Sequence, residues 1–391
     1  MKAYPLHPPG AAAEAPPAPA TPLFGSMLMG GFECAAHKRR DGRRLDVMAA
    51  TGHDRRAAED YRLLHRHGMT AARDGLCWHR IERSQGYYDW SGLLPMLRAA
   101  RETGTTIIWD LLHYGLPDGI DPFSAEFVRR FATFARHAAR VIDGESDVAP
   151  VYTPINEISF WAFAGGETAG LTPFAFGRGA ELKRQLVRAA LAATAEVRAV
   201  DGRARIASAE PLIHVFPAGP GPDAADLAAA HNQAQHEALD MLLGLQAPEL
   251  GGHANAVDIV GWNYYHNNQW IDGGRSVPPG EWIHRPLHQL LAEAASRHGK
   301  PGYIAETGCE GAFRPFWLRY VASEVRQAQA MGVPLGGICL YPIISHLGWD
   351  DDRPCANGLF DGHDPDSPRT LFTPLADEIA AQTALFAGAP A

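Results

Sequence analysis

Residues 152–157 (YTPINE) and 302–308 (GYIAETG) decide the fold of this chain. Each stretch reads as a short buried strand that ends in a glutamate and opens into a loop. A carboxylate at the carboxyl end of a parallel strand is held by a rigid element and still faces the substrate, which is where (β/α)8 barrels place their chemistry. Glu157 and Glu306 are therefore a candidate catalytic pair, and two carboxylates are what cleavage of a glycosidic bond requires.

Strand-like and helix-like segments alternate through the rest of the chain. Short apolar segments predict strands at 26–33, 70–78, 105–112, 149–156, 204–210, 257–265, 302–306 and 335–341. Segments whose apolar residues recur every three or four positions predict helices, and they lie at 55–67, 93–102, 125–142, 182–200, 226–243, 287–297 and 316–331. Strands and helices in this alternation predict a single (β/α)8 TIM barrel.

A doubly wound open sheet is the alternative architecture. Such a sheet normally carries a glycine-rich phosphate-binding turn after its first strand, and residues 29–33 (MGGFE) do not match that pattern. The composition shows no break after residue 24. We therefore expect a disordered Pro/Ala-rich tail over residues 1–22 and one barrel over residues 23–391.

Composition excludes several classes of partner. The 391 residues are 46% hydrophobic and 20% charged, with a formal net charge of −9. Acidic and basic residues are interleaved, and the one dense basic run, residues 38–44, is broken by Asp41. We expect no nucleic acid and no anionic membrane as a partner, because such surfaces bind concentrated basic patches. No apolar run approaches ~18 residues, so no segment is expected to span a membrane.

The cysteines indicate a reducing compartment. Five are scattered along the chain without C-x-x-C spacing: Cys34, Cys77, Cys309, Cys339 and Cys355. This pattern predicts reduced thiols rather than a disulfide framework or a zinc site. The N-terminal residues lack the apolar core of a signal peptide. We therefore expect a cytoplasmic protein, and we expect it to need neither a cofactor nor a metal ion.

Polar and aromatic residues follow many of the predicted strands. In a barrel such residues face one common site, and here they are Glu33, His37, Arg73, His113, Asn156, Asn263, Tyr265, Tyr341, His346 and Trp349. Aromatic faces can stack on the C–H surface of a sugar ring while polar groups bind its hydroxyls. We interpret this set as the lining of a sugar pocket, whereas Glu210 on the fifth strand fits a pocket or a structural role equally well.

Glycoside hydrolysis needs two carboxyl groups with different pKa values. An arginine beside one carboxylate keeps it ionised, and burial beside an apolar wall raises the pKa of the other. Arg73 and Tyr265 are the candidates for holding Glu306 as an anionic nucleophile. Glu157 is then the acid and later the base. In a retaining pair the two carboxyl groups lie ~5–5.5 Å apart.

Two other interpretations use some of the same residues. A metal site with nitrogen and oxygen ligands could be built from His113, His346, Asp110 and Glu306. No H-x-H or H-x-x-E spacing supports that site, and insensitivity to chelators would exclude it. The non-enzyme alternative is a sugar-binding barrel that has lost activity. Such a loss usually removes the carboxylates first, and both are present here.

Five motifs resemble those of the family 1 glycoside hydrolases, part of a clan of retaining glycosidases built on this barrel. They occur in the family's order over roughly residues 24–360. The family's N-E-P, T-E-N-G, H-W-D-L-P, G-L-N-Y-Y and R…W-x-R-I patterns resemble Asn156-Glu157, 305–308 (AETG), 112–117 (LHYGLP), 261–265 (GWNYY) and Arg73 with 78–81 (WHRI).

The resemblance implies a role for several residues. Glu157 is implied to be the acid/base and Glu306 the nucleophile, with Tyr265 in contact with the nucleophile. Asn156 is implied to touch the 2-hydroxyl of the sugar, and His113 the region of the 3-hydroxyl. The implied substrate is a small-molecule or oligosaccharide glycoside. Surface aromatic residues could serve a homo-oligomer interface or the rim of the site, and the sequence does not distinguish the two.

The chain departs from the family at the wall that reads the far side of the sugar. Where the family carries W-S-x-x-D-N-x-E-W, residues 341–349 read YPIISHLGW. In the family, a glutamate at this position binds the 4- and 6-hydroxyls of glucose. In this chain the position is occupied by Gly348. The first-strand glutamine is also missing, with His37 or Glu33 near its place. The resemblance thus predicts an intact catalytic pair that acts on a sugar other than plain glucose, and leaves hydrolysis and transfer to another sugar as alternatives.

Overall fold

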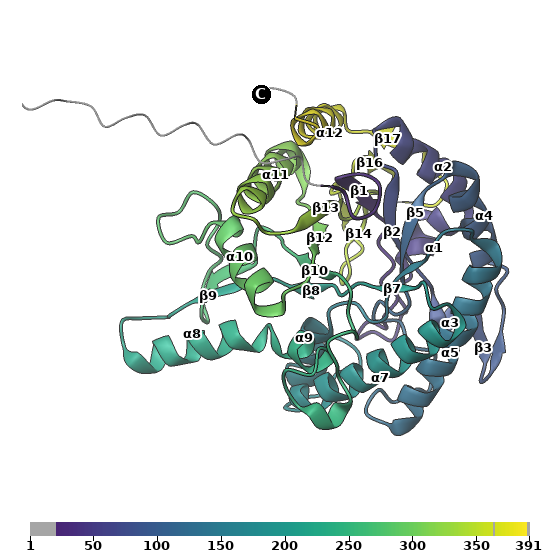
Figure 1. The fold of residues 1–391 in the computed structure, drawn as a ribbon, viewed down its shortest axis with the longest axis horizontal. Coiled ribbons are helices and arrows are strands. Elements are labelled where there is room, and N and C mark those ends of the chain that lie inside the picture. Colours follow the sequence, from purple (N-terminus) through teal and green to yellow (C-terminus); the bar gives the residue numbers. More distant parts are fainter. Residues whose placement is uncertain (1–20, 363, 389–391) are drawn as a thin grey trace, which may run out of the picture.

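A computed structural model describes residues 21–362 and 364–388 of the chain. Its centre is a ring of parallel strands with helices outside them (Figure 1). The strands are β1 (Leu28–Gly31), β2 (Ala71–Gly75), β5 (Thr106–Asp110), β6 (Val151–Thr153), β7 (Arg205–Ile206), β8 (Glu210–Pro211), β10 (Val260–Asn263), β12 (Gly302–Thr307) and β13 (Leu335–Leu340). The predicted tail lies, apart from residues 21 and 22, outside the described residues.

The ring is closed. β13 pairs with β1, while β7 pairs with β6 and β8 pairs with β10. β7 and β8 are two parts of one strand, because Ala207 between them forms a parallel bridge to Ile259 just before β10. The result is eight strand positions, each parallel to its neighbours, and the predicted (β/α)8 barrel is confirmed.

Helices cover the outside of this ring (Figure 1). Their apolar stripes are buried as the sequence predicts, and Phe127, Phe131 and Phe134 of α5 are fully buried. The covering helices are α2 (His53–Arg66), α4 (Leu93–Thr103), α5 (Ala125–Glu145), α7 (Gly179–Val200), α9 (Glu237–Leu242), α10 (Leu287–His298), α11 (Arg314–Ala330) and α12 (Thr373–Phe386), whereas α8 (Pro222–Ala234) projects from the ring.

Two helices differ from the prediction. The single helix expected over residues 226–243 is divided into α8 and α9. Ala228 is the one buried residue of α8, and this helix extends away from the ring. Packing against the core therefore does not keep α8 and α9 as one continuous helix. α12 was not predicted, although Leu375 and Ile379 have the spacing of a buried stripe.

Shorter elements complete the loops. They are α1 (Val47–Thr51), α3 (Trp78–Ile81), β3 (Glu82–Ser84), β4 (Tyr87–Tyr88), α6 (Ile158–Trp161), a π-helical segment (Ala162–Glu167), β9 (His214–Phe216), 3₁₀ turns at Pro248–Leu250 and Gly311–Phe313, β11 (Gln269–Ile271), β14 (His346–Leu347), β15 (Pro354–Cys355), β16 (Phe360–Asp361) and β17 (Thr370–Leu371). No helix in the described ranges has both the length and the apolar character needed to cross a membrane.

The interior of the barrel is packed rather than open. One buried cluster draws apolar side chains from every strand position: Met29, Ala71, Ile108, Val151, Ala207, Ile259, Tyr303 and Cys339. Tyr341 follows β13 and lies against β1, where a Cβ on Gly31 would come within 2.1 Å of its ring. Glycine at that position is therefore what lets Tyr341 enter the barrel. The filled interior leaves the carboxyl ends of the strands as the floor on which a site can be built.

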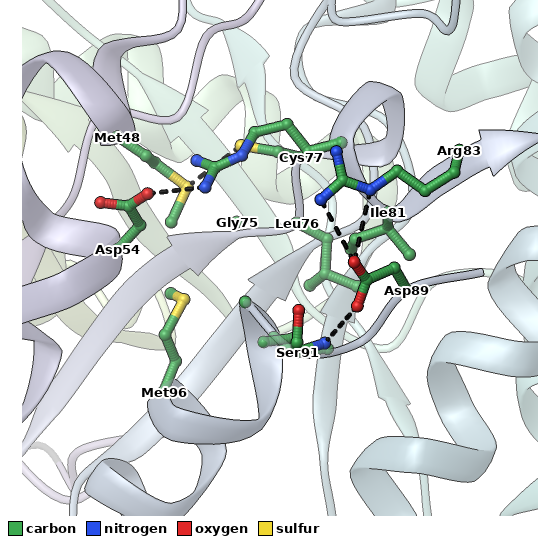
Figure 2. A pocket seen from close by; sticks show the side chains of 13 residues that line it. Met48, Asp54, Gly75, Leu76, Cys77, Ile81, Arg83, Asp89, Ser91 and Met96 are labelled. Carbon is green, nitrogen blue, oxygen red and sulfur yellow. Dashed lines mark hydrogen bonds and ion pairs between the residues drawn. The ribbon is translucent and has the colours of Figure 1, made fainter.

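A cavity of about 90 Å³ lies beside the carboxyl end of β2. Figure 2 shows its lining, in which Arg83 pairs with Asp89 at 3.2 Å and two methionines, Met48 and Met96, add apolar surface. None of the residues predicted to bind sugar lines this cavity. It is a small gap between β2, α3 and α4, and it is separate from the strand-end residues described next.

Candidate active site

Glu157 stands at a strained turn directly after β6. Its φ of 45° is in the left-handed region, which non-glycine residues seldom adopt. Glu210 on β8 holds the turn in place, because its carboxylate accepts hydrogen bonds from the backbone N–H groups of Ile158 and Ser159 at 2.7 and 3.0 Å. Glu210 is thus a positioning residue for Glu157 and answers the alternative that the sequence left open.

Neutral groups donate to both carboxylate oxygens of Glu157. The hydroxyl of Tyr114 donates to Oε2 at 2.6 Å, and Nδ2 of Asn263 donates to Oε1 at 2.9 Å. Burial raises the pKa of Glu157, and these two hydrogen bonds oppose part of that rise. A carboxyl group in these surroundings can hold a proton nearer to neutral pH than an exposed glutamate does.

Glu306 receives a charged donor instead. It is 5% exposed at the end of β12. Nη1 of Arg73 donates to Oε1 at 2.6 Å, and the hydroxyl of Tyr265 donates to Oε2 at 2.9 Å. These are the partners that the sequence analysis assigned to Glu306, and the structure brings all three side chains together.

The expected effect of Arg73 on Glu306 needs a correction. Burial and, to a smaller extent, the nearby Glu157 raise the pKa of Glu306 to about 7, against the lowering effect of Arg73. Burial raises this pKa more than Arg73 lowers it. The guanidinium is also shared with a second carboxylate. Asp110 takes Nε and Nη2 of the same guanidinium at 2.9 and 2.6 Å.

Arg73 is the hub of the site. Its side chain is fully buried and also donates from Nη2 to Oδ1 of Asn156 at 2.6 Å. The ring of Tyr341 lies 5.3 Å from the guanidinium carbon, within cation–π range. A buried arginine therefore has an acceptor or a π face on each side, as its burial requires.

The contact with Arg73 fixes the orientation of the Asn156 amide. Because Oδ1 accepts from Arg73, Nδ2 must face the other way, where it donates to the Tyr114 hydroxyl and to Nε2 of His113, both at 3.0 Å. The neutral His113 ring then carries its proton on Nδ1, which faces Oδ2 of Asp110 at 3.1 Å. Both amide hydrogens of Asn156 are used, so a sugar hydroxyl would replace one of these partners.

The two glutamates belong to one hydrogen-bonded network. It runs from Glu157 through Tyr114, Asn156 and Arg73 to Glu306. Arg73 lies within β2 and the other members lie at or beyond the carboxyl ends of β5, β6 and β12, so the residues predicted from separate strands converge at this end of the barrel.

Glu33 and Tyr341 join the network beside His113. Oε1 of Glu33 lies 3.6 Å from Nε2 of His113 and accepts from the backbone N–H of Ala35 at 2.8 Å. The Tyr341 hydroxyl lies 3.5 Å from both Glu33 and His113. These residues form the wall on the side of β1 and β13.

His37 and Trp349 extend this wall. Their ring centroids are 5.0 Å apart, and Trp349 lies 5.8 Å from the ring of Tyr114. Burial lowers the pKa of His37 to about 4, so the imidazole is neutral at pH 7. Its Nδ1 is buried and has no hydrogen-bond partner among the described residues.

His346 is placed apart from the other predicted residues. It lies on β14, and its ring nitrogens face the Leu347 carbonyl at 2.6 Å and the Asn357 side chain at 3.3 Å. Within the described part of the chain, no hydrogen bond or ring contact joins it to the two glutamates. His346 belongs to the β14–β15 hairpin in this structure.

Two members of the site were not predicted as such. Tyr114 follows His113 in the motif at residues 112–117, and Asp110, inside the predicted strand at 105–112, was named only as a possible metal ligand. The signal for Asp110 was available, because a charged residue in an apolar strand needs a partner to be buried.

A metal ion does not fit this site. Cys34, Asp110 and His113 place donor atoms within 4.8 Å of one another. Both oxygens of Asp110, however, are bound by the Arg73 guanidinium, whose charge repels a cation. Burial also raises the pKa of the Cys34 thiol well above its usual value, which disfavours the thiolate that a metal would need.

Solved structures with this fold include several β-glucosidases. A family 1 β-glucosidase from Thermotoga maritima aligns with a TM-score of 0.75 and 16% identity, over 94% of this chain and 98% of that chain. The AHE enzyme from Alicyclobacillus herbarius aligns with a TM-score of 0.76 and 18% identity, over 93% and 99%. The β-glycosidase BGL167 aligns with a TM-score of 0.69 and 20% identity, over 88% of each chain.

At this level of identity the likeness concerns the fold. The predicted resemblance to the family 1 glycoside hydrolases is confirmed in that sense, since the alignments span nearly the whole barrel. Neither a protein-family model nor a curated protein sequence matches the chain. What the site does is therefore argued from its own geometry.

Proposed function

We propose that this protein is a retaining β-glycosidase. Glu306 attacks the anomeric carbon while Glu157 protonates the leaving oxygen, and Glu157 then activates the water that releases the sugar. The observation that carries the proposal is the unequal donor sets of the two carboxyl groups. Glu306 accepts from a guanidinium, whereas Glu157 accepts only from a phenol and an amide.

The difference between the hydrogen-bond donors of Glu306 and Glu157 determines which of them is the nucleophile and which is the acid. Two close carboxylates oppose each other's ionisation, so the pair holds about one proton near neutral pH. The positive charge of Arg73 favours the ionised form of Glu306, and the neutral donors leave the proton to Glu157. An ionised nucleophile beside a protonated acid is the starting state of a retaining glycosidase. The occurrence of the same fold in β-glucosidases supports a glycosidase activity for this site.

We further propose a sugar other than plain glucose. Gly348 occupies the hairpin turn where the family has a glutamate, and a Cβ at this position would come within 2.2 Å of Oδ1 of Asp351. The Asp351 carboxylate therefore occupies the space into which a side chain at residue 348 would extend. The neutral imidazole of His37 and the indole of Trp349 form the wall instead. These two side chains carry no charge that could grip two adjacent hydroxyls.

A cavity of about 360 Å³ adjoins His37 and gives room for a second sugar unit or an aglycone. It lies between the loop after β1 and the loop after the π-helical segment, with Arg40 over the ring of Phe174 at 5.2 Å. A cavity next to the site supports an extended glycoside as the substrate.

We also propose a cytoplasmic location. All five cysteines are unpaired in the structure. Disulfides are rare in reducing compartments, so free thiols fit the cytoplasm. Fractionation of the source cells followed by detection with an antibody tests this proposal, and recovery outside the cytoplasmic fraction would contradict it.

Initial rates on aryl β-glycosides test the activity. The panel spans gluco, galacto, manno, fuco, xylo, arabino and glucurono sugars, with Glu306→Gln as the blank. Turnover of at least one sugar that is absent in Glu306→Gln is expected, and ¹H NMR should show the β anomer as the first product. Release of the α anomer would contradict the retaining mechanism. Binding of sugars without turnover across the panel would point to the non-enzyme barrel.

A further inference from the structure

Asp110 contacts neither glutamate of the proposed pair, yet it holds the residues that do. It ends β5, and its carboxylate is fully buried. Oδ1 accepts from Nε of Arg73 at 2.9 Å and Oδ2 accepts from Nη2 at 2.6 Å, which is a two-bond pairing along one edge of the guanidinium. Oδ2 also faces Nδ1 of His113 at 3.1 Å.

This pairing decides which part of Arg73 is left for Glu306. With Nε and Nη2 held by Asp110, Nη1 is the nitrogen that reaches Glu306. One buried positive charge is thus shared by two buried carboxylates. Asp110 takes two hydrogen bonds from it and Glu306 takes one.

A carboxylate that shares its cation is less stabilised than one that holds the cation alone. Glu306 also faces titratable or charged groups from the other strands around it, namely Glu33, His113, Tyr114, Glu157, Tyr265, Tyr303, Cys339 and Tyr341. Among the described residues, Arg73 is the side chain that hydrogen-bonds both Glu306 and Asp110. A change of charge at residue 110 should therefore reach Glu306 through Arg73.

We propose that Asp110 is a positioning residue that, through Arg73, sets the pH range over which Glu306 is ionised. It orients the guanidinium toward Glu306 and at the same time withholds part of its charge. The inference rests on the proposed function where it treats Glu306 as the nucleophile. The ionisation of Glu306 itself can be measured whether or not the protein is an active glycosidase.

The test is Asp110→Asn in the full chain, with the titration of Glu306 followed by NMR. Protein labelled with ¹³C at the glutamate carboxyl carbon gives one resonance per glutamate, and the Glu306 resonance is identified by its loss in Glu306→Gln. The titration midpoint of Glu306 should fall by about one pH unit or more, because neighbouring charges shift pKa values on that scale. An unchanged or raised midpoint overturns the proposal.

Further variants separate charge from packing. Asp110→Ser is a second neutral replacement and should lower the midpoint as well, even where the Asn amide perturbs the fold. Asp110→Glu keeps the charge, so its midpoint should stay closer to that of the parent protein. A midpoint in Asp110→Glu as low as in Asp110→Asn would overturn the role of the charge. Thermal unfolding of each variant reports whether the fold is kept.

Asp60 offers a matched control. It forms the same two-bond pairing with the buried Arg369, at 2.8 and 2.9 Å, outside the site. Asp60→Asn should lower stability and leave the Glu306 midpoint unchanged. An equal shift in Asp60→Asn would mean that general loosening, not Asp110, moves the midpoint, and would overturn the proposal. With an active enzyme, the acidic limb of kcat/KM in Asp110→Asn should move to lower pH by the same amount.

Discussion

Asn263 lies directly opposite Glu306 in the pairing of β10 with β12, and its Nδ2 donates to Glu157 at 2.9 Å. One side chain therefore connects the strand beside the proposed nucleophile to the proposed acid. Its Oδ1 is buried and has no hydrogen-bond partner among the described residues. The hydrogen bond from Nδ2 favours the ionised form of Glu157.

Asn263→Ala should shift the basic limb of the pH profile. The substitution removes one of the two hydrogen bonds that favour the ionised form of Glu157, so the pKa of Glu157 rises. Because the acid must be protonated to act, the basic limb of kcat/KM should move to higher pH by about 0.5–1 unit, the equivalent of one hydrogen bond. A basic limb that stays in place in Asn263→Ala would show that this contact does not tune Glu157.

The architecture could be read from the sequence because its signals are local. Short apolar strands such as 105–112 alternate with helices that carry a buried stripe, and this pattern alone gives the barrel. The divided helix at 226–243 could not be read, because its sequence is helical throughout and its break depends on where the chain leaves the barrel.

Contacts in the site could be predicted where the chemistry of one residue requires a particular partner. Contacts that depend on strand register or on backbone conformation could not be predicted. The need of an ionised nucleophile for a nearby arginine predicted the contact between Arg73 and Glu306. That Asp110 takes a second share of the same charge follows from the register of the strands, in which Asp110 lies opposite Gly75. Tyr114 has a φ of 63°, and its hydroxyl donates to Glu157. Non-glycine residues seldom adopt this left-handed conformation, so the sequence does not predict it.

Glu157→Ala and Glu306→Ala should differ in chemical rescue. Glu157→Ala should lose ~10²–10⁴-fold on substrates with poor leaving groups, since general acid catalysis supplies a factor of that size. With a good leaving group it should keep turnover, and azide should raise the rate by replacing the activated water. Glu306→Ala should lose turnover on both kinds of substrate because no carboxylate attacks.

Glu59→Ala, on the exposed side of α2, is a control with no expected effect. Equal losses in the two variants on the good leaving group would contradict the division of roles.

Glu210→Ala should weaken catalysis without changing the chemistry. The variant leaves the backbone N–H groups of Ile158 and Ser159 without their acceptor, which costs about 1–3 kcal/mol when such groups are buried. The turn that carries Glu157 should relax, so kcat should fall more than KM changes. Urea unfolding measures the stability and initial rates measure the split. A rise in KM with unchanged kcat would indicate instead that Glu210 binds substrate.

Glu306 should cost the fold stability at neutral and alkaline pH. Burial raises the pKa of Glu306 to about 7 from a usual value near 4.5, so the folded state holds its proton more tightly than the unfolded chain. The tighter binding of this proton stabilises the folded state. The stabilisation is fully present below about pH 4.5 and is lost as the pH rises through 7.

Glu306→Gln removes the titrating group and leaves Arg73 paired with Asp110. The variant should therefore be more stable than the parent protein at pH 8, by about 1–3 kcal/mol, and this advantage should vanish near pH 5. Urea unfolding at pH 5, 6, 7 and 8 measures the difference, with Glu59→Gln on the exposed side of α2 as the control. A difference that does not change with pH would show that Glu306 is not the group whose ionisation opposes folding.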